Sequence, residues 1–106
     1  MSRQKGDFAE QRAVDFLVDK GYKIITRNYY SRFGEIDIIT QKDSVLHFVE
    51  VKSGEGDPIY KITPSKLSKI IKTADIYMQK NRIDMDYCFD AVIVTTEIEF
   101  IGNITL

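Results

Sequence analysis

Apolar residues recur at helical spacing in two parts of the chain. In the first, from Gly6 to Asp19, Ala13 and Leu17 lie one turn apart and mark the side that we expect to be buried. The second begins after Thr63-Pro64, because threonine caps helices well and proline suits the first helical position. Its predicted buried stripe consists of Leu67, Ile70, Ile71, Ala74, Tyr77 and Met78. The pattern therefore predicts two amphipathic helices.

The remaining segments are typical of strands, because apolar and β-branched residues run between turn-forming ones. Predicted strands are Tyr22 to Asn28, Glu35 to Thr40 and Val45 to Lys52, with one or two more within Tyr87 to Thr95 and Ile98 to Ile104. Turns are predicted at residues 31–34 and 41–44, and a loop at Ser53 to Pro58. This order predicts an α/β fold with a mixed central sheet flanked by helices. An antiparallel meander leads through a crossover helix to the fourth strand.

Length and composition narrow the class of protein. A chain of 106 residues predicts a single domain over residues 1–106, and 43% hydrophobic with 29% charged residues is typical of a globular protein. No apolar run approaches the ~18 residues of a membrane span, and the N-terminus lacks a secretory signal pattern. We therefore expect a cytoplasmic protein with no membrane partner. The single cysteine, Cys88, excludes an internal disulfide and predicts no cysteine-based metal cluster.

Charge is unevenly distributed although the net charge is only −1. Six basic residues gather in one segment against a single acid, Asp75: Lys61, Lys66, Lys69, Lys72, Lys80 and Arg82. Lys66 and Lys69 flank the apolar stripe and could contact phosphates, whereas a solvated helix face is the preferred reading for Lys72 and Lys80.

Three residues just before the acidic strand, Tyr29, Tyr30 and Arg32, are further candidates for nucleic-acid contact. They could stack on unpaired bases, which is worth roughly 1–3 kcal/mol per base. Ordinary loop packing is the alternative for all three. The sequence therefore predicts a nucleic-acid-binding surface made of Lys66, Lys69, Arg32 and Tyr30.

Charged residues interrupt two of the predicted strands. If Lys42-Asp43 forms a two-residue loop, Glu35 faces Glu50 across the hairpin. Alternation then places Glu35, Asp37, Glu50 and Lys52 on one face, and Ile36, Ile38, Val45, Val49 and Val51 on the other. A loop with an odd number of residues would separate the two acidic pairs. Glu10 shares the helix face of Ala13 and Leu17 and adds a further carboxylate.

Such a group of charges favours metal chemistry. Carboxylates ~5 Å apart repel one another, and a divalent cation removes that repulsion. Mg²⁺ is commonly held by one or two carboxylates with waters and substrate phosphates, and it can activate a water for phosphodiester hydrolysis. Lys52 could position that water or stabilise developing charge. The alternative is an ordinary Glu35–Lys52 ion pair with Asp37 facing solvent.

The same residues resemble a known family. Gly34-Glu35-Ile36-Asp37 followed by Phe48-Val49-Glu50-Val51-Lys52 resembles the D…(D/E)-x-K core of restriction-endonuclease-like folds. The YraN-type family of that superfamily is similar over nearly the whole chain, through residues 6–13, Gly21-Tyr22, Arg27-Asn28, Lys66, Lys69, Ala74, Tyr77 and Phe89-Asp90. Departures are Ala9 in place of a glycine, Ser53 in place of a basic residue, and Cys88 in place of an arginine.

The resemblance implies a fold and a set of site residues. The fold is the restriction-endonuclease-like αβββαβ core. The catalytic residues would be Asp37, Glu50, Lys52 and Glu10, the last being similar to the helix glutamate of archaeal Holliday-junction resolvases. Asp37, Glu50 and Glu10 would hold Mg²⁺ or Mn²⁺.

The resulting expectation is a Mg²⁺-dependent nuclease-like protein that hydrolyses DNA phosphodiesters, on branched or single-stranded structures. A homodimer would supply two sites. Two alternatives stay open: a non-catalytic nucleic-acid-binding or adaptor domain, and a protein-interaction module.

Three further residues have more modest expectations. His47 falls on the opposite face from the acids and is interpreted as a structural histidine. Cys88 is expected to be a small core residue. Asp90 is expected to be an outer partner of the acidic site or a member of an ion pair.

Overall fold

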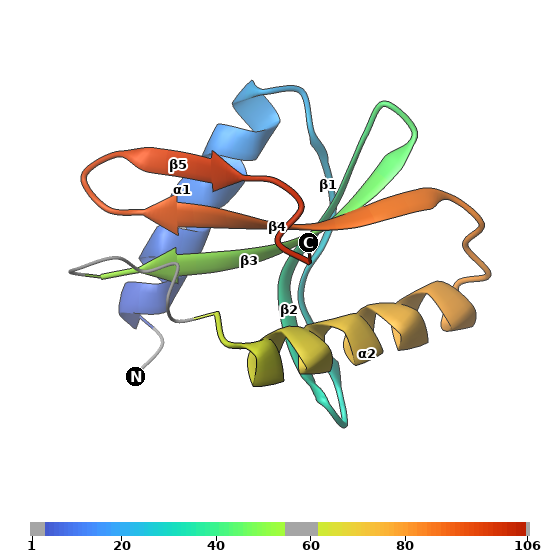
Figure 1. The fold of residues 1–106 in the computed structure, drawn as a ribbon. Helices are drawn as coiled ribbons and strands as arrows, with labels where there is room; N and C mark the ends of the chain where they lie inside the picture. Colours follow the sequence, from blue (N-terminus) through green and yellow to red (C-terminus); the bar gives the residue numbers. More distant parts are fainter. Residues whose placement is uncertain (1–3, 55–61, 106) are drawn as a thin grey trace.

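The protein is an α/β structure in which two helices flank a five-stranded mixed sheet (Figure 1). This computed structural model describes residues 4–54 and 62–105. The elements are α1 (Gln4–Asp19), β1 (Lys23–Ser31), β2 (Gly34–Lys42), β3 (Val45–Ser53), α2 (Pro64–Lys80), β4 (Asp86–Val94) and β5 (Ile98–Ile101). Within these ranges neither helix is long and apolar enough to cross a membrane.

The strands lie in the order β1-β2-β3-β4-β5. β3 and β4 are parallel, and every other neighbouring pair is antiparallel. Parallel neighbours need a crossover, and α2 supplies it. The predicted mixed sheet, with a meander followed by a crossover helix, is thereby confirmed. Lys61 and most of the loop predicted at Ser53 to Pro58 fall outside the described residues.

Two apolar clusters lie on opposite faces of the sheet. Under α1, the cluster contains Ala9, Ala13, Val14, Leu17, Ile38, Val49, Val92 and Val94. Under α2, it contains Ile36, Ile39, Leu46, Phe48, Ile70, Ala74, Tyr77 and Phe89. Consecutive residues of one strand enter different clusters, as Phe48 and Val49 do, because side chains alternate along a strand. The sheet is therefore buried on both sides.

The start of α2 is as predicted, but its buried stripe is narrower. Thr63 is the N-cap, its hydroxyl accepts a hydrogen bond from the Lys66 amide, and Pro64 opens the helix. Buried positions are Ile70, Thr73, Ala74 and Tyr77. Ile71 is 41% exposed, so its predicted place in the stripe is wrong. α2 lies nearest to β2 and β1 and packs on the sheet through Ile70, Ala74 and Tyr77, so Ile71 falls outside the buried face.

The β2–β3 turn corrects the predicted register. Lys42 pairs with Val45, so the loop is Asp43-Ser44 and not Lys42-Asp43. Both loop residues have positive φ, 52° and 66°, as a tight hairpin with two left-handed residues requires. The loop still has an even number of residues, but the register moves by two. Glu35 therefore does not lie opposite Glu50, as had been predicted.

A bend at the middle of β1 and β2 changes which face some side chains occupy. Asn28 in β1 has a φ of 54°, and on either side of it Arg27 pairs with Ile38 and Tyr29 with Ile36. Beyond this point Ile36 enters the α2 cluster, whereas Ile38 lies in the α1 cluster. The prediction that both isoleucines share one face is therefore wrong. The left-handed residue interrupts the regular alternation on which that prediction depended.

Candidate functional site

Asp37 and Glu50 meet where the pairing of β2 with β3 stops. The last paired residues are Ile38 and Val49, and Asp37 and Glu50 are the next ones outward. Asp37 Oδ2 accepts a hydrogen bond of 2.8 Å from the Val51 amide. Glu50 is 7% exposed, and its Oε1 has no hydrogen-bond partner among the described residues. The acidic site thus lies inside both strands, where their pairing ends, and one buried Glu50 oxygen is unsatisfied within the described part of the chain.

The surroundings oppose the charged form of both carboxylates. Burial raises the pKa of Glu50 to about 8, with the negative charge of Asp37 adding to the effect. Burial also raises the pKa of Asp37 to about 6, against the lowering effect of the Val51 amide. The charge of Glu35 raises the pKa of both groups and that of Lys52 lowers it. Near neutral pH the Asp37–Glu50 pair therefore retains a proton in the absence of a cation.

Lys52 lies beside this pair. Its ammonium is 3.8 Å from Glu50 Oε2, and its side chain is 20% exposed. An ammonium in this position partly offsets the carboxylate charge. It also keeps access to solvent, so it can donate hydrogen bonds to a group that binds over the acids. The predicted proximity of Asp37, Glu50 and Lys52 is present in the structure.

Glu10 reaches the same region from α1 but has partners of its own. It is 4% exposed, and its Oε1 accepts hydrogen bonds from Arg27 Nε at 2.9 Å and Asn28 Nδ2 at 3.1 Å. Its charge contributes to the raised pKa of Asp37, so the two carboxylates are within electrostatic reach. Glu10 does not form a compact three-ligand group with Asp37 and Glu50 in the described residues.

Basic side chains gather around the turn between β1 and β2. The Arg32 guanidinium lies 4.8 Å from the centre of the Phe33 ring, and the Lys72 ammonium lies 5.3 Å from the same ring. The stem of Lys69 lies against Gly34. We call Arg32, Lys69 and Lys72 the turn basic surface. Gly34 is three residues before Asp37, which is about 10 Å along a strand.

The other predicted nucleic-acid contacts lie around this surface. Tyr30 is 61% exposed. It lines, with Arg32 and Lys80, a surface hollow of about 380 Å³ whose other walls are Ser31, Ile76 and Gln79. Lys66 is exposed in the first turn of α2. The structure thus brings Tyr30 and Arg32 together with the C-terminal part of α2.

Sequence reasoning gave Arg27 and Asn28 no contact of their own, and it interpreted Lys72 as part of a solvated helix face. Arg27 and Asn28 fix Glu10, and Lys72 joins Arg32 at Phe33. The signal for Lys72 was its spacing from Lys69, because residues three apart on a helix are neighbours. No local pattern could have paired Arg27 with Glu10, because the contact joins a strand to a helix across 17 residues.

Comparison with known proteins gives the family. Residues 9–94 match the sequence model of a family described as "Uncharacterised protein family UPF0102". The UPF0102 protein WS0451 of Wolinella succinogenes is 59% identical, with both chains covered completely. A UPF0102 protein of Sulfurimonas denitrificans is 56% identical over the whole of both chains, and one of Helicobacter pylori is 52% identical, covering 97% of this chain and 92% of its own. The chain belongs to the UPF0102 family, the YraN-like family that its motifs resemble.

Proposed function

We propose that this protein is a Mg²⁺-dependent nuclease of the restriction-endonuclease-like type, which hydrolyses DNA phosphodiesters. The observation that carries the proposal is the buried Glu50 oxygen beside Asp37 and Lys52, which has no hydrogen-bond partner in residues 4–54 and 62–105. A buried carboxylate oxygen normally finds a partner, and an orphan at a cluster of like charges is explained by a ligand that is a cation.

The side chains fit such a cation. Asp37 and Glu50 supply oxygen donors only, which suits Mg²⁺ or Mn²⁺ and does not suit soft metals. Two carboxylates are enough, because Mg²⁺ commonly keeps waters and takes substrate phosphate oxygens as further ligands. Glu10 is proposed to assist from α1, while Arg27 and Asn28 keep it oriented. When bound, the metal would supply a Lewis acid and a water of lowered pKa.

The remaining residues would bind and orient the DNA. Lys52 is placed to donate hydrogen bonds to the scissile phosphate or to the attacking water. The turn basic surface, which begins at Gly34 about 10 Å along β2 from Asp37, and Lys66 would hold the flanking phosphates. Tyr30 is 61% exposed, and we propose that it stacks on an unpaired base, which suits branched or single-stranded DNA better than a regular duplex.

Cleavage assays test the proposal directly. The full-length protein is incubated with branched, nicked and single-stranded DNA in Mg²⁺ or Mn²⁺, and we expect cleavage of at least one of them. Asp37→Asn and Lys52→Ala should abolish it, whereas the exposed Glu99→Gln should not change it. Cleavage that persists in both variants would overturn the assignment.

The turn basic surface also supports a second candidate, a non-catalytic nucleic-acid-binding or adaptor domain. Arg32, Lys69 and Lys72 can bind phosphate without any contribution from the acids. This candidate predicts salt-dependent DNA binding without turnover. Calorimetry separates the two, because only the nuclease proposal expects divalent-ion binding that Asp37→Asn and Glu50→Gln remove.

A further inference from the structure

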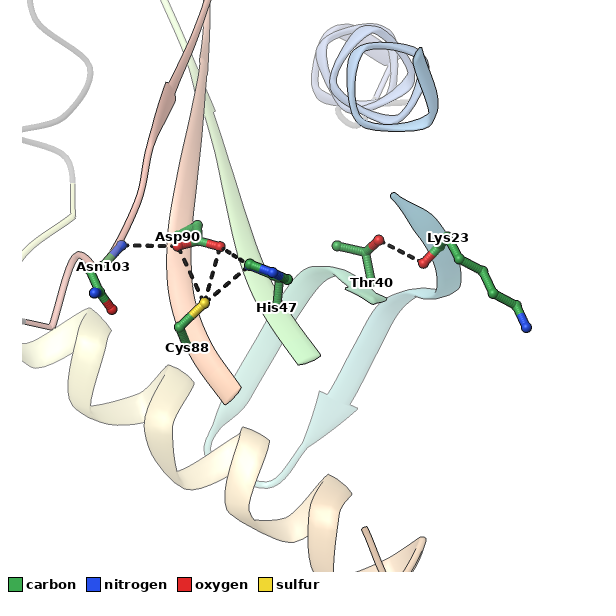
Figure 2. Close-up of polar contacts among 6 residues, drawn as sticks. All are labelled: Lys23, Thr40, His47, Cys88, Asp90 and Asn103. Carbon is green, nitrogen blue, oxygen red and sulfur yellow. Dashed lines mark hydrogen bonds and ion pairs between the residues drawn. The ribbon is translucent and has the colours of Figure 1, made fainter. Parts of the chain in front are cut away.

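A second polar cluster lies on the same sheet, away from the acidic site (Figure 2). His47 of β3 and Cys88 of β4 are paired positions of the two parallel strands, and Asp90 lies two residues after Cys88. The His47 Nδ1 atom is 2.5 Å from Asp90 Oδ2 and 3.1 Å from Cys88 Sγ. The Cys88 thiol also approaches Asp90 Oδ2 at 3.5 Å. The three side chains therefore converge on one point.

This convergence differs from what the sequence predicted for Cys88. The residue belongs to neither described apolar cluster, so the expectation of a small core residue is wrong. Asp90 does pair with a histidine, in line with one of the two expectations for it. Within the described residues this is the one group of three or more His, Cys, Asp or Glu side chains close enough to share a metal ion.

We propose that His47, Cys88 and Asp90 form a Zn²⁺ site, with His47 Nδ1, Cys88 Sγ and Asp90 Oδ2 as ligands and a water in the fourth position. Nitrogen, sulfur and oxygen donors of these kinds are the ligands that Zn²⁺ accepts, and three protein ligands with one open position are a common arrangement. The thiolate excludes Mg²⁺ as the preferred ion. The proposed occupant therefore differs from that of the acidic site.

The distances suit a tetrahedral ion after a small expansion. Zinc bonds of ~2.0–2.3 Å place tetrahedral ligand atoms roughly 3.3–3.7 Å apart. The Cys88 Sγ distances of 3.1 Å and 3.5 Å are already close to this range. Cys88 Sγ and His47 Nδ1 must separate by about 0.2 Å, and His47 Nδ1 and Asp90 Oδ2, now 2.5 Å apart, by about 0.8 Å. A side-chain rotation is sufficient for a change of this size.

The surroundings hold the proposed ligands in place. Asp90 is 2% exposed, and its other oxygen, Oδ1, accepts a 2.9 Å hydrogen bond from the Asn103 amide (Figure 2). That bond leaves Oδ2 directed at His47 and Cys88. The Tyr22 ring packs edge-on against the His47 ring, with centroids 5.1 Å apart. Outer contacts of this kind orient metal ligands and raise affinity.

The ligands are also reachable and their charges balance. His47 and Cys88 are half-buried, so an ion can enter. Without a metal, burial and the Asp90 carboxylate raise the pKa of the Cys88 thiol to about 12, so it carries its proton. Binding would release that thiol proton together with any proton on Nδ1, while Nε2 keeps its hydrogen. One thiolate and one carboxylate then neutralise the dication.

Cobalt substitution tests the site in the intact, reduced protein. Co²⁺ that is bound by a thiolate in tetrahedral geometry gives a near-ultraviolet charge-transfer band and intense visible bands, and Zn²⁺ should displace it at one equivalent. Cys88 is the only cysteine, so the charge-transfer band can come from no other residue. We also expect Zn²⁺ to raise the melting temperature of the wild type. Absence of the charge-transfer band in the wild type would overturn the proposal.

Variants separate a three-ligand site from adventitious thiol binding. Cys88→Ser should lose the charge-transfer band and the zinc-dependent rise in melting temperature. His47→Ala and Asp90→Asn should each weaken Co²⁺ binding by at least about 10–100-fold, the loss that follows removal of even an outer partner. A band with unchanged affinity in both variants would mean that the thiol acts alone, and would refute the site.

Two controls complete the design. Circular dichroism verifies the fold of each variant, and Cys88→Ser and Asp90→Asn keep the side-chain shape. Glu50→Gln should leave the charge-transfer band unchanged, because Glu50 lies three residues from His47 on the opposite face of β3. Loss of this band in a folded Glu50→Gln protein would mean that Co²⁺ binding depends on the acidic site and not on the three proposed ligands, and would overturn the proposal. The result is independent of whether DNA is cleaved.

Discussion

Glu50 is the side chain whose ionisation the fold opposes most strongly. Its pKa is raised from 4.5 to about 8, so the folded chain holds the proton more tightly than the unfolded chain does. The stabilisation from Glu50 is therefore full below about pH 4.5, falls as the pH rises, and is lost by about pH 8. This window sets the first prediction.

We predict that Glu50→Gln is more stable than the wild type at pH 8.5, by roughly 1–3 kcal/mol, because a neutral amide replaces a buried, unpaired charge. At pH 5 the difference should shrink, since Glu50 is then protonated. Urea unfolding of the metal-free protein at both pH values measures this. Glu99→Gln, at an exposed position of β5, is the control and should show no such pH dependence.

Arg27 contacts the Glu10 carboxylate through two guanidinium nitrogens, so replacing it should lower the free energy of unfolding. Arg27→Gln leaves a carboxylate that is 4% exposed with only Asn28 as a described hydrogen-bond donor. We expect a loss of roughly 1–3 kcal/mol in the free energy of unfolding at pH 8. Lys23→Gln, an exposed change on the same strand, is the comparison. A double variant with Glu10→Gln should recover part of the loss, and an Arg27→Gln variant as stable as Lys23→Gln would contradict this account.

For individual residues, the sequence predicted which side chains of the β2–β3 hairpin lie together, but not the backbone conformation of Asn28 or the contacts between α1 and the sheet. The parity of the hairpin loop correctly brought Asp37, Glu50 and Lys52 together, because any even loop preserves the faces. The bend at Asn28 was not predictable, since asparagine is only one of several residues that tolerate a positive φ. Contacts such as Arg27 with Glu10 depend on how α1 lies on the sheet, which no local pattern encodes.

Among the elements, the β2–β3 hairpin has a turn whose second residue, Ser44, is not the residue type that favours its conformation. Ser44 adopts a φ of 66°, a conformation that glycine adopts without steric cost. We predict that Ser44→Gly stabilises the protein by about 0.5–1 kcal/mol in urea unfolding.

The matched control for this change lies on α2. Ser68→Gly, at an exposed helical position, should instead destabilise the protein by about 0.5–1 kcal/mol, because glycine is a poor helix former. Equal effects of the two substitutions would show that the turn conformation is not what matters. The sequence placed the loop at Lys42-Asp43 because neither asparagine nor glycine marks the true loop, Asp43-Ser44.

For the whole molecule, the topology followed from element order, because a helix between two strands of one sheet makes them parallel. The sequence also showed that basic residues cluster in one segment, but not where that segment lies on the folded protein. The basic residues of α2 meet Arg32 only because α2 packs against the β1–β2 turn, where Ser31 and Thr73 hydroxyls lie 2.7 Å apart. The resulting surface gives the last prediction.

We predict that replacing Arg32, Lys69 and Lys72 together with glutamine weakens DNA binding and lowers the magnitude of the salt slope by roughly 2–3, about 0.7–0.9 for each lost phosphate contact. Fluorescence anisotropy over a range of salt concentrations measures the slope. Lys20→Gln with Lys23→Gln, outside this surface, should leave it unchanged. An equal change of slope in both variants would mean that binding follows overall charge and not this surface.

The bond between the Asp37 carboxylate and the Val51 amide makes one backbone group a natural reporter. A hydrogen bond to a carboxylate shifts an amide resonance to an extent that depends on the charge of the acceptor. The Val51 signal in a nitrogen–proton NMR spectrum should therefore move with the titration of Asp37, and again when Mg²⁺ is added. A single resonance of the nitrogen-15-labelled wild type would then give the occupancy of the acidic site without substrate or substitution.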